Sequence, residues 1–204
     1  MERVYVYIDG FNLYFGLREK GWRRFFWLNV FKLAENLIKE GQELCTVKYF
    51  TSRVRKPPEK SKRQTLFLEA LESTKKIQIF YGHYLINSIE CRNCGNIFPK
   101  PNEKMTDVNI AVEMLTDAFE DRYDTALLIS ADSDLSGPIK KIKKLFPRKK
   151  VVIAFPPARF SFSLQKLAHA SFTIGRKKLK ESQFPDKIKK DDGYVLSRPA
   201  KWKE

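Results

Sequence analysis

The chain has 204 residues, of which 43% are hydrophobic and 13% aromatic. This composition excludes a disordered chain and allows one domain with a substantial core, or a domain with a tail. No apolar run approaches the roughly 20 residues that cross a bilayer. A strand-like pattern begins within three residues of the N-terminus, which leaves no room for a signal peptide. We therefore expect a cytoplasmic protein without a membrane partner.

The balance of charge favours a polyanionic partner. The chain carries 39 Lys and Arg against 24 Asp and Glu, a formal net charge of +15. Such a surplus attracts phosphate backbones through direct contacts and counterion release. A charge that serves solubility alone is the alternative. We expect contact with nucleic acid.

Strand and helix patterns alternate along the chain. In chain order we predict a strand at 3–8, helices at 12–17 and 30–38, a strand at 46–52, a helix at 64–73, a strand or strand pair at 77–86 interrupted at Gly82, a helix at 106–119, a strand at 125–129, a helix at 135–146, a strand at 151–155, a helix at 161–168 and a strand at 171–174. This alternation indicates an α/β sandwich with a mostly parallel sheet.

Two segments differ from this pattern. Residues 87–102 form a small insertion with a Cys-x-x-Cys turn and two prolines. Residues 176–204 form a C-terminal tail. The tail is basic, because 175–204 hold ten Lys or Arg against five Asp or Glu. The tail is either an ordered arm or a disordered segment. We therefore divide the chain into a domain at 1–175 and a tail at 176–204.

Acidic residues gather at one predicted edge of the sheet. Asp9 directly follows the first strand, and Asp132 and Asp134 follow the strand at 125–129. In a parallel sheet the carboxyl ends of the strands share one edge, which is where open α/β folds bind ligands. Asp107 lies in the first turn of its helix, on the face that packs against the sheet. Helix capping or the helix dipole would explain one or two of these acids, but not four on one rim.

The chemistry of such a cluster points to a divalent metal. Several carboxylates within a few ångströms cannot all stay ionised without a cation. Oxygen ligands suit Mg²⁺ or Mn²⁺, which activate water and stabilise the charge that develops in phosphodiester hydrolysis. The side chains that we expect to bind substrate near this cluster are Asn12, Lys104, Ser130, Ser133, Lys140 and Lys144. Lys140 and Lys144 share a helix face, and the alternative for them is a solvated surface.

Three motifs carry a resemblance to a known family. The segments Ile8–Asp9–Gly10–Phe11–Asn12–Leu13, Glu103–Lys104–Met105–Thr106–Asp107–Val108 and Ser130–Ala131–Asp132–Ser133–Asp134–Leu135 resemble the motifs of NYN domains. These domains belong to the PIN-like nuclease superfamily, and the resemblance is strongest to the bacterial and archaeal LabA-like branch. It covers roughly residues 1–175.

The resemblance implies a Rossmann-like (PIN-like) three-layer sandwich, a Mg²⁺ or Mn²⁺ site and ribonuclease activity on single-stranded or structured RNA. Asp9, Asp107 and Asp132 match the acidic positions of the family, with Asp134 and Asn12 in supporting places. Some members of such a family act by binding RNA.

The cysteine pair in the insertion resembles half of a zinc ribbon. Cys91 and Cys94 supply two thiolates, and a structural zinc needs four ligands. His83 is the nearest candidate for a third. A redox-inert turn, or a knuckle that has lost its metal, are the alternatives.

Three functions fit these residues. The leading hypothesis is a metal-dependent ribonuclease with Asp9, Asp107, Asp132 and Asp134 at its centre. An RNA-binding or regulatory module with little activity is the alternative, and a phosphatase or phosphotransferase ranks last because Asp9 lacks the Asp-x-Asp pattern. A homodimer would extend the basic surface. The aromatic cluster of Trp22, Phe25, Phe26 and Trp27 would either stack bases or pack inside, and we favour packing.

Overall fold

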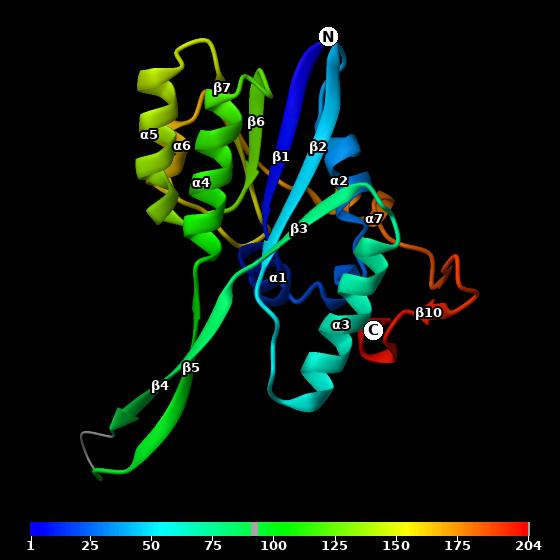
Figure 1. The fold of residues 1–204 in the computed structure, drawn as a ribbon. Helices are drawn as coiled ribbons and strands as arrows, with labels where there is room; N and C mark the ends of the chain where they lie inside the picture. The colour runs from blue at the N-terminus through cyan, green and yellow to red at the C-terminus, as the bar shows by residue number, and fades with distance from the viewer. Residues whose placement is uncertain (91–93, 204) are drawn as a thin grey trace.

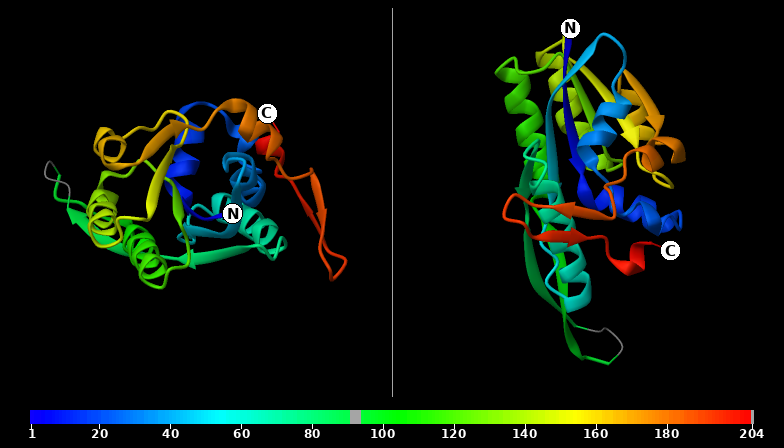
Figure 2. Two further views of the ribbon diagram at one scale, coloured as in Figure 1. Left: turned by 90° about the horizontal axis from the view of Figure 1, so that it is seen from above. Right: turned by 90° about the vertical axis from the view of Figure 1, so that its right-hand side faces the viewer.

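A six-stranded parallel sheet forms the centre of the molecule (Figures 1 and 2). The computed structural model describes residues 1–90 and 94–203, with the backbone alone at 83–89 and 98–104. The strands run in the order β3-β2-β1-β6-β7-β8. Their bounds are β1 (Glu2–Asp9), β2 (Gln42–Thr51), β3 (Ile77–Tyr81), β6 (Thr125–Ile129), β7 (Lys150–Phe155) and β8 (Ala170–Thr173). The predicted parallel sheet is confirmed.

Helices cover both faces of the sheet. Alternate side chains of each strand point to opposite faces, so apolar strands present buried side chains on both sides. In β1, Val6 and Ile8 join one buried cluster and Tyr7 joins the other. The first cluster includes residues of α1 (Gly10–Glu19), η1 (Arg23–Phe25), α2 (Val30–Leu37), α3 (Pro58–Glu72) and α7 (Arg176–Glu181). The second includes residues of α4 (Thr106–Phe119), η2 (Ser133–Leu135), α5 (Ser136–Leu145) and α6 (Phe162–Leu167). The result is the predicted three-layer sandwich.

Helix α4 has the predicted bounds, and its buried face carries a residue that the apolar pattern does not show. The residue before it is Met105, whose φ of 80° is left-handed, and no side chain caps the helix there. The inward face carries Asp117, which is fully buried. The sequence pattern counted only apolar positions on this face, so it missed that acid.

Asp117 belongs to a buried charge network between α4 and the sheet. Lys48 of β2 is 2% exposed, and its Nζ lies 2.6 Å from Asp117 Oδ2 and 2.6 Å from Glu113 Oε2. The Tyr7 hydroxyl donates to Asp117 Oδ2 at 2.6 Å. Burial and the neighbouring Asp117 charge hold the pKa of Tyr7 well above its ordinary value. The network therefore keeps its charges compensated inside the core.

An antiparallel hairpin projects from the sheet (Figure 1). Its strands are β4 (His83–Glu90) and β5 (Ile97–Lys104), and their register pairs residue 83 with 104 and 90 with 97. The predicted insertion at 87–102 is thus longer, because the pairing begins directly after Gly82. The predicted strand at 77–86 divides there into β3 and β4, which belong to different sheets.

The C-terminal segment packs onto the domain. After α7 it forms the hairpin strands β9 (Lys187–Lys189) and β10 (Val195–Ser197) and the turn η3 (Ala200–Trp202). Leu179, Phe184, Leu196 and Trp202 are buried in the first cluster. The indole Nε1 of Trp27 donates to the Pro185 carbonyl at 2.8 Å. A disordered tail is therefore the wrong alternative for 176–203.

The aromatic cluster after α1 serves packing. Phe25, Phe26 and Trp27 are all buried, and the Trp202 ring lies 5.8 Å from Phe26 and 6.2 Å from Trp27. Trp22 packs against the same core with part of its surface exposed. Packing therefore accounts for these contacts, and Phe25 and Phe26 also line a cavity described below.

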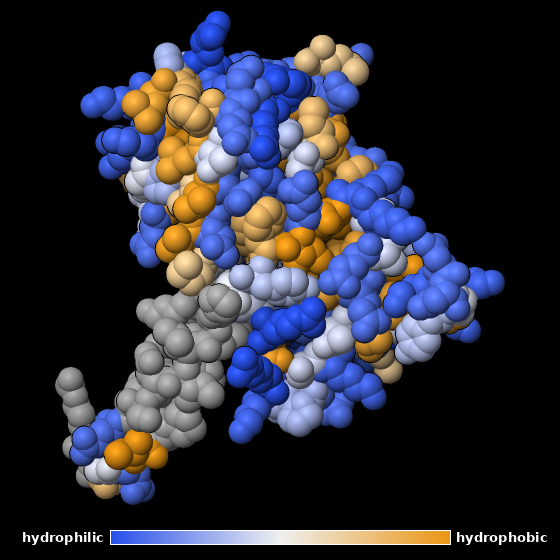
Figure 3. Space-filling model, viewed as in Figure 1, coloured by the Kyte–Doolittle hydropathy of each residue, from blue (hydrophilic) through white to orange (hydrophobic). Residues whose placement is uncertain are grey.

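The face of the molecule in Figure 3 is mostly hydrophilic, as the charge of +15 leads one to expect. In the described ranges, no helix combines the length and the apolar character that crossing a membrane requires.

Candidate active site

Asp9 is the centre of the acidic edge. It is the last residue of β1 and is 4% exposed. Its Oδ1 accepts a hydrogen bond from the backbone N–H of Asn12 at 2.9 Å, so it caps the N-terminus of α1. A side chain on Gly10 would lie 2.7 Å from the carbonyl oxygen of Phe50. Only glycine therefore lets the chain turn from Asp9 into α1 so close to β2.

A chain of hydrogen bonds joins Asp9 to the end of the neighbouring strand β6. The Ser130 hydroxyl donates to Asp9 Oδ2 at 3.0 Å and accepts from the backbone N–H of Asp132 at 3.0 Å. The Asn12 side-chain oxygen accepts from the Ala131 N–H at 3.1 Å. Because Ser130 and Asn12 are buried, these bonds fix the loop after β6 against the start of α1.

The prediction that these acids share one edge of the sheet is supported electrostatically. Burial, together with the negative charges of Asp107 and Asp132, raises the pKa of Asp9 to about 7. The bonds from Asn12 and Ser130 oppose that shift, since they stabilise the ionised carboxylate. Asp107 is partly exposed in the first turn of α4, which contacts both β1 and η2. The charges of Asp107 and Asp132 thus both act on Asp9 at this edge of the sheet.

Capping explains only part of this arrangement. Asp132 Oδ1 accepts from the Asp134 N–H at 2.9 Å and so caps η2, as one alternative reading of the sequence expected. Asp9 caps α1 in the same way. A cap gains little from burial and repulsion, because an exposed Asp satisfies the same N–H group. The burial of Asp9 therefore needs another explanation.

The donor chemistry fits a hard divalent cation. Carboxylate oxygens are the ligands that Mg²⁺ and Mn²⁺ prefer, and a cation would relieve the repulsion around Asp9. Within residues 1–90 and 94–203, no group of three or more His, Cys, Asp or Glu is close enough to hold a metal as it stands. Mg²⁺ commonly uses only one or two carboxylates together with waters and substrate phosphates. Asp9, Asp107 and Asp132 therefore fit such an ion without forming a closed cage.

The other predicted residues lie farther out. The side chains of Asp134 and Ser133 are exposed in η2, and those of Lys140 and Lys144 are exposed on α5. Lys104 ends β5, where its backbone pairs with His83, and its side chain lies outside the described part. Asn12 and Ser130 hold neighbouring acidic residues in place, a positioning role that we did not predict.

The hairpin register separates the candidate zinc ligands. His83 lies at the base of β4, whereas Cys94 follows the far end of that strand and is exposed. Seven strand steps of about 3.4 Å place His83 roughly 24 Å from Glu90. Cys91 lies outside the described residues. A zinc site that combines His83 with Cys94 of one chain is therefore incompatible with this register.

Sequence reasoning also missed Tyr49 of β2. Its side chain is 5% exposed, and its hydroxyl oxygen would lie 2.5 Å from a side-chain carbon placed on Gly10. Burial raises the pKa of Tyr49, and the Asp9 charge adds to that shift. A strand pattern cannot show this contact, because residue 49 reads as one more inward apolar position.

Comparison with known proteins supports the fold. A structure of a protein of unknown function from Vibrio parahaemolyticus is similar with a TM-score of 0.60 and 19% identity, over 90% of this chain and 96% of that one. At that identity the likeness concerns the fold alone. The 6-hydroxy-3-succinoylpyridine 3-monooxygenase HspA of Pseudomonas putida is 26% identical over 176 residues, which are 69% of this chain and 55% of that protein. The chain thus spans about half the length of this relative.

The family model of the NYN domain matches residues 3–175. This range begins in β1, contains all four predicted aspartates and ends directly before α7. Because the match covers most of the chain, the protein belongs to the NYN domain family of the PIN-like superfamily.

Proposed function

We propose that this protein is a metal-dependent ribonuclease. The observation that carries the proposal is the hydrogen-bonded chain from Asp9 through Ser130 to Asp132, with the Asp107 charge beside it. Carboxylates at the end of β1, in the loop after β6 and in the first turn of α4 support the proposal, because open α/β folds bind ligands at the carboxyl ends of their strands. NYN domains are typically nucleases that act on RNA, which gives the proposal its reaction and substrate class.

Each acidic residue has its own part in this proposal. Asp9, Asp107 and Asp132 would hold Mg²⁺ or Mn²⁺, and the exposed Asp134 would be a further ligand or an orienting group. The ion, when bound, supplies activation of water and neutralisation of charge on the phosphodiester. Ser130 and Asn12 hold Asp9 and the loop after β6 in position, because both side chains are committed to hydrogen bonds.

The basic residues would bind the RNA backbone. Lys140 and Lys144 continue from η2 along one exposed face of α5, and Lys104 and Ser133 flank the acids in the sequence. The surplus of +15 favours a polyanion over a small neutral substrate. A second copy of the chain would extend this basic surface, and the homodimer stays a prediction.

Two other functions remain to be separated from this one. An RNA-binding module of the same fold would bind RNA with the acids idle. The relative from Pseudomonas putida is named as a monooxygenase of a pyridine compound, and such chemistry consumes O₂. Hydrolysis of RNA does not, so an oxygen-free assay distinguishes the two reactions.

The test is cleavage of end-labelled single-stranded RNA by the intact chain under nitrogen. We expect cutting with Mn²⁺ or Mg²⁺ that EDTA stops. Asp9→Asn should lose more than about a hundredfold in rate, since loss of outer partners of a metal ligand already costs about 10–100-fold. Tight RNA binding without cutting in either metal would replace this proposal with the binding module.

A further inference from the structure

A cavity lies beside Asp9 on the other side of Gly10. Its volume is about 330 Å³, within the range of about 300–1,000 Å³ that is typical of small-ligand sites. It lies between α1, the turn η1, the strand β2 and α3, and the C-terminal turn η3 forms part of its wall. Gly10 and Phe11, the two residues after Asp9, line it. The cavity is therefore adjacent to the acidic site and is not a remote packing defect.

The wall of the cavity is aromatic. Tyr14, Phe25, Phe26, Phe67 and Trp202 all line it. Flat π faces accept any base by stacking, because every nucleobase has a π face of its own. Aliphatic side chains, Leu17 and Leu28 among them, complete the apolar wall. A wall with this many aromatic rings suits a planar ring.

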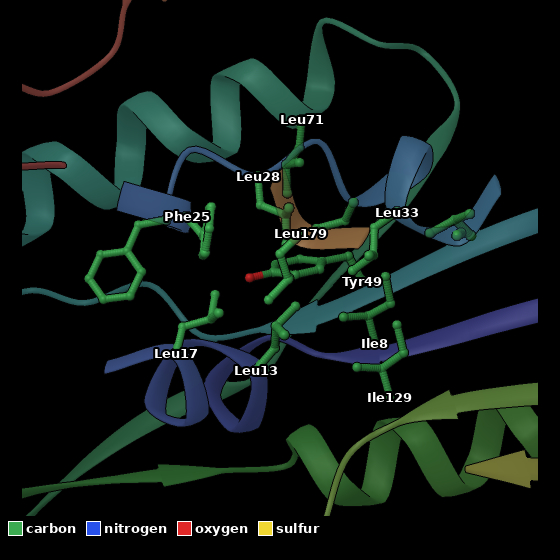
Figure 4. Packing of buried hydrophobic residues seen from close by; sticks show 14 of the residues in the cluster. Ile8, Leu13, Leu17, Phe25, Leu28, Leu33, Tyr49, Leu71, Ile129 and Leu179 are labelled. Carbon is green, nitrogen blue, oxygen red and sulfur yellow. The ribbon is translucent and has the colours of Figure 1, made fainter. Parts of the chain in front are cut away.

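One buried polar group points into this apolar space. Figure 4 shows the Tyr49 hydroxyl directed toward the space between Leu17, Phe25 and Leu28, which line the cavity. None of the hydrogen bonds among the described residues involves that hydroxyl, which faces the cavity. An occupant with a polar edge would therefore gain a hydrogen bond there.

Cations surround the cavity without acids to balance them. Arg18, Arg23, Lys60, Arg63 and Lys201 line it, and no Asp or Glu does. None of these five forms an ion pair with another described residue. Burial, and then the positive charges of Arg18 and Arg63, lower the pKa of Lys60. An anion bound here would relieve the crowding of like charges.

We propose that this cavity is a nucleotide subsite, in which a nucleobase enters among the aromatic side chains and hydrogen-bonds to Tyr49 while its phosphate binds the surrounding cations. For its substrate class the proposal rests on the proposed ribonuclease function. A base held here places its own strand next to Asp9, because Gly10 and Phe11 belong to both the cavity and the turn after Asp9. Lys201 and Trp202 lie beyond the matched domain, so the C-terminal segment completes this subsite.

The test measures binding by the intact chain in EDTA, so that cleavage has no part in it. The probes are the four nucleoside 5′-monophosphates, ribose 5-phosphate, and a fluorescent RNA octamer with and without one abasic nucleotide. We expect the monophosphates to bind at least about fivefold more tightly than ribose 5-phosphate, since stacking of one base contributes that much. A preference for the intact octamer over its abasic form, with no binding of free nucleotides, assigns the subsite to a base within a strand.

Two lysines of α3 provide the matched comparison. Lys60 lines the cavity, whereas Lys62 is exposed on the same helix and lies outside it. Lys60→Ala should weaken nucleotide binding by about tenfold or more, as loss of a charged hydrogen bond does, and Lys62→Ala should change it less than about twofold. Equal effects of the two substitutions would overturn the proposal.

Tyr49→Phe removes the hydroxyl and keeps the ring. It should weaken nucleotide binding about threefold to tenfold and leave ribose 5-phosphate binding unchanged. Ribose 5-phosphate that binds as tightly as the nucleotides would overturn the subsite. Failure of this proposal is distinct from failure of the proposed function. If the protein cuts RNA but Lys60→Ala does not change nucleotide binding, the ribonuclease function stands and the subsite is wrong. If the protein binds nucleotides through Lys60 but does not cut RNA, the subsite stands and the ribonuclease function is wrong.

Discussion

Ser130 and Asp9 lie 121 positions apart in the chain, yet the Ser130 hydroxyl donates to Asp9 Oδ2 at 3.0 Å. The same hydroxyl accepts the Asp132 N–H. One small side chain thus sets the positions of two acids that we propose as metal ligands.

Ser130→Ala tests this positioning role. We expect RNA cleavage to fall about 10–100-fold, the loss that follows removal of a partner of a metal ligand, while RNA affinity in EDTA stays unchanged. Ser133→Ala, three residues along the same loop and exposed, should cost clearly less. Cleavage rates and RNA affinities are measured for both variants. Equal losses of cleavage rate in Ser130→Ala and Ser133→Ala would contradict the positioning role.

Asp107→Asn separates catalysis from binding. The change removes one negative charge from the edge of the sheet and keeps the shape of the side chain. Cleavage should be lost, while affinity for RNA should hold or rise because less charge repels the phosphates. Glu120→Gln, just beyond the other end of α4, is the control. Normal cleavage by the Asp107 variant would remove this residue from the site.

Metal binding should stabilise the native protein and leave the stability of the Asp9→Asn variant unchanged. At a Mn²⁺ concentration of about 100 times its dissociation constant, the free energy of unfolding should rise by about 2.7 kcal/mol. In EDTA above pH 7 the Asp9→Asn variant itself should be more stable than the native chain, because the buried Asp9 carboxylate is then ionised. Urea titrations with and without Mn²⁺ measure both effects, and an equal response to Mn²⁺ in the two proteins would exclude Asp9 as a ligand.

The buried network of Lys48 and Asp117 should matter for folding. Asp117→Ala removes one of the two carboxylates that lie 2.6 Å from Lys48, which is 2% exposed, and also the acceptor of the Tyr7 hydroxyl, so the free energy of unfolding should drop by about 3–5 kcal/mol. The double variant Lys48→Met with Asp117→Leu should recover most of that loss, since it removes both charges together. Urea midpoints give the comparison, and a single variant as stable as the double would show that Glu113 alone is a sufficient partner for Lys48.

Acid should weaken the contact that joins Arg3 to Asp124. The hydrogen bond from the Arg3 side chain, followed by that from its backbone N–H, lowers the pKa of Asp124 from 3.8 to about 2. A carboxyl whose folded pKa is depressed stabilises the protein above its unfolded pKa and loses that contribution as the pH falls through its folded pKa. The loss should therefore occur between about pH 4 and pH 2 and amount to at most about 1 kcal/mol, since the pair is partly exposed. Asp124→Asn should remove this part of the pH dependence of unfolding.

The period of the apolar residues and the spacing of the motifs were sufficient to predict the sandwich and the edge of the sheet that carries the acids. Strong apolar runs such as 125–129 form central strands, and Asp9 and Asp132 follow such runs, so the parallel sheet brings them to one edge. Contacts between distant segments could not be predicted from period and spacing. Lys48 and Tyr49 are adjacent in one strand and face opposite sides of the sheet, so their partners depend on the tertiary packing. The same holds for Trp202, whose buried position depends on an aromatic cluster some 175 residues earlier.

The packing of Trp202 has a practical consequence for recombinant work on this protein. A fragment cut at residue 175, where the family match ends, would expose the Trp27 and Phe26 rings that Trp202 now contacts. Apolar surface uncovered in this way promotes aggregation, and the fragment would also lack Lys201. Fragments that end at the family boundary should therefore express poorly, and inactivity of such a fragment would say nothing about the acids of the intact chain.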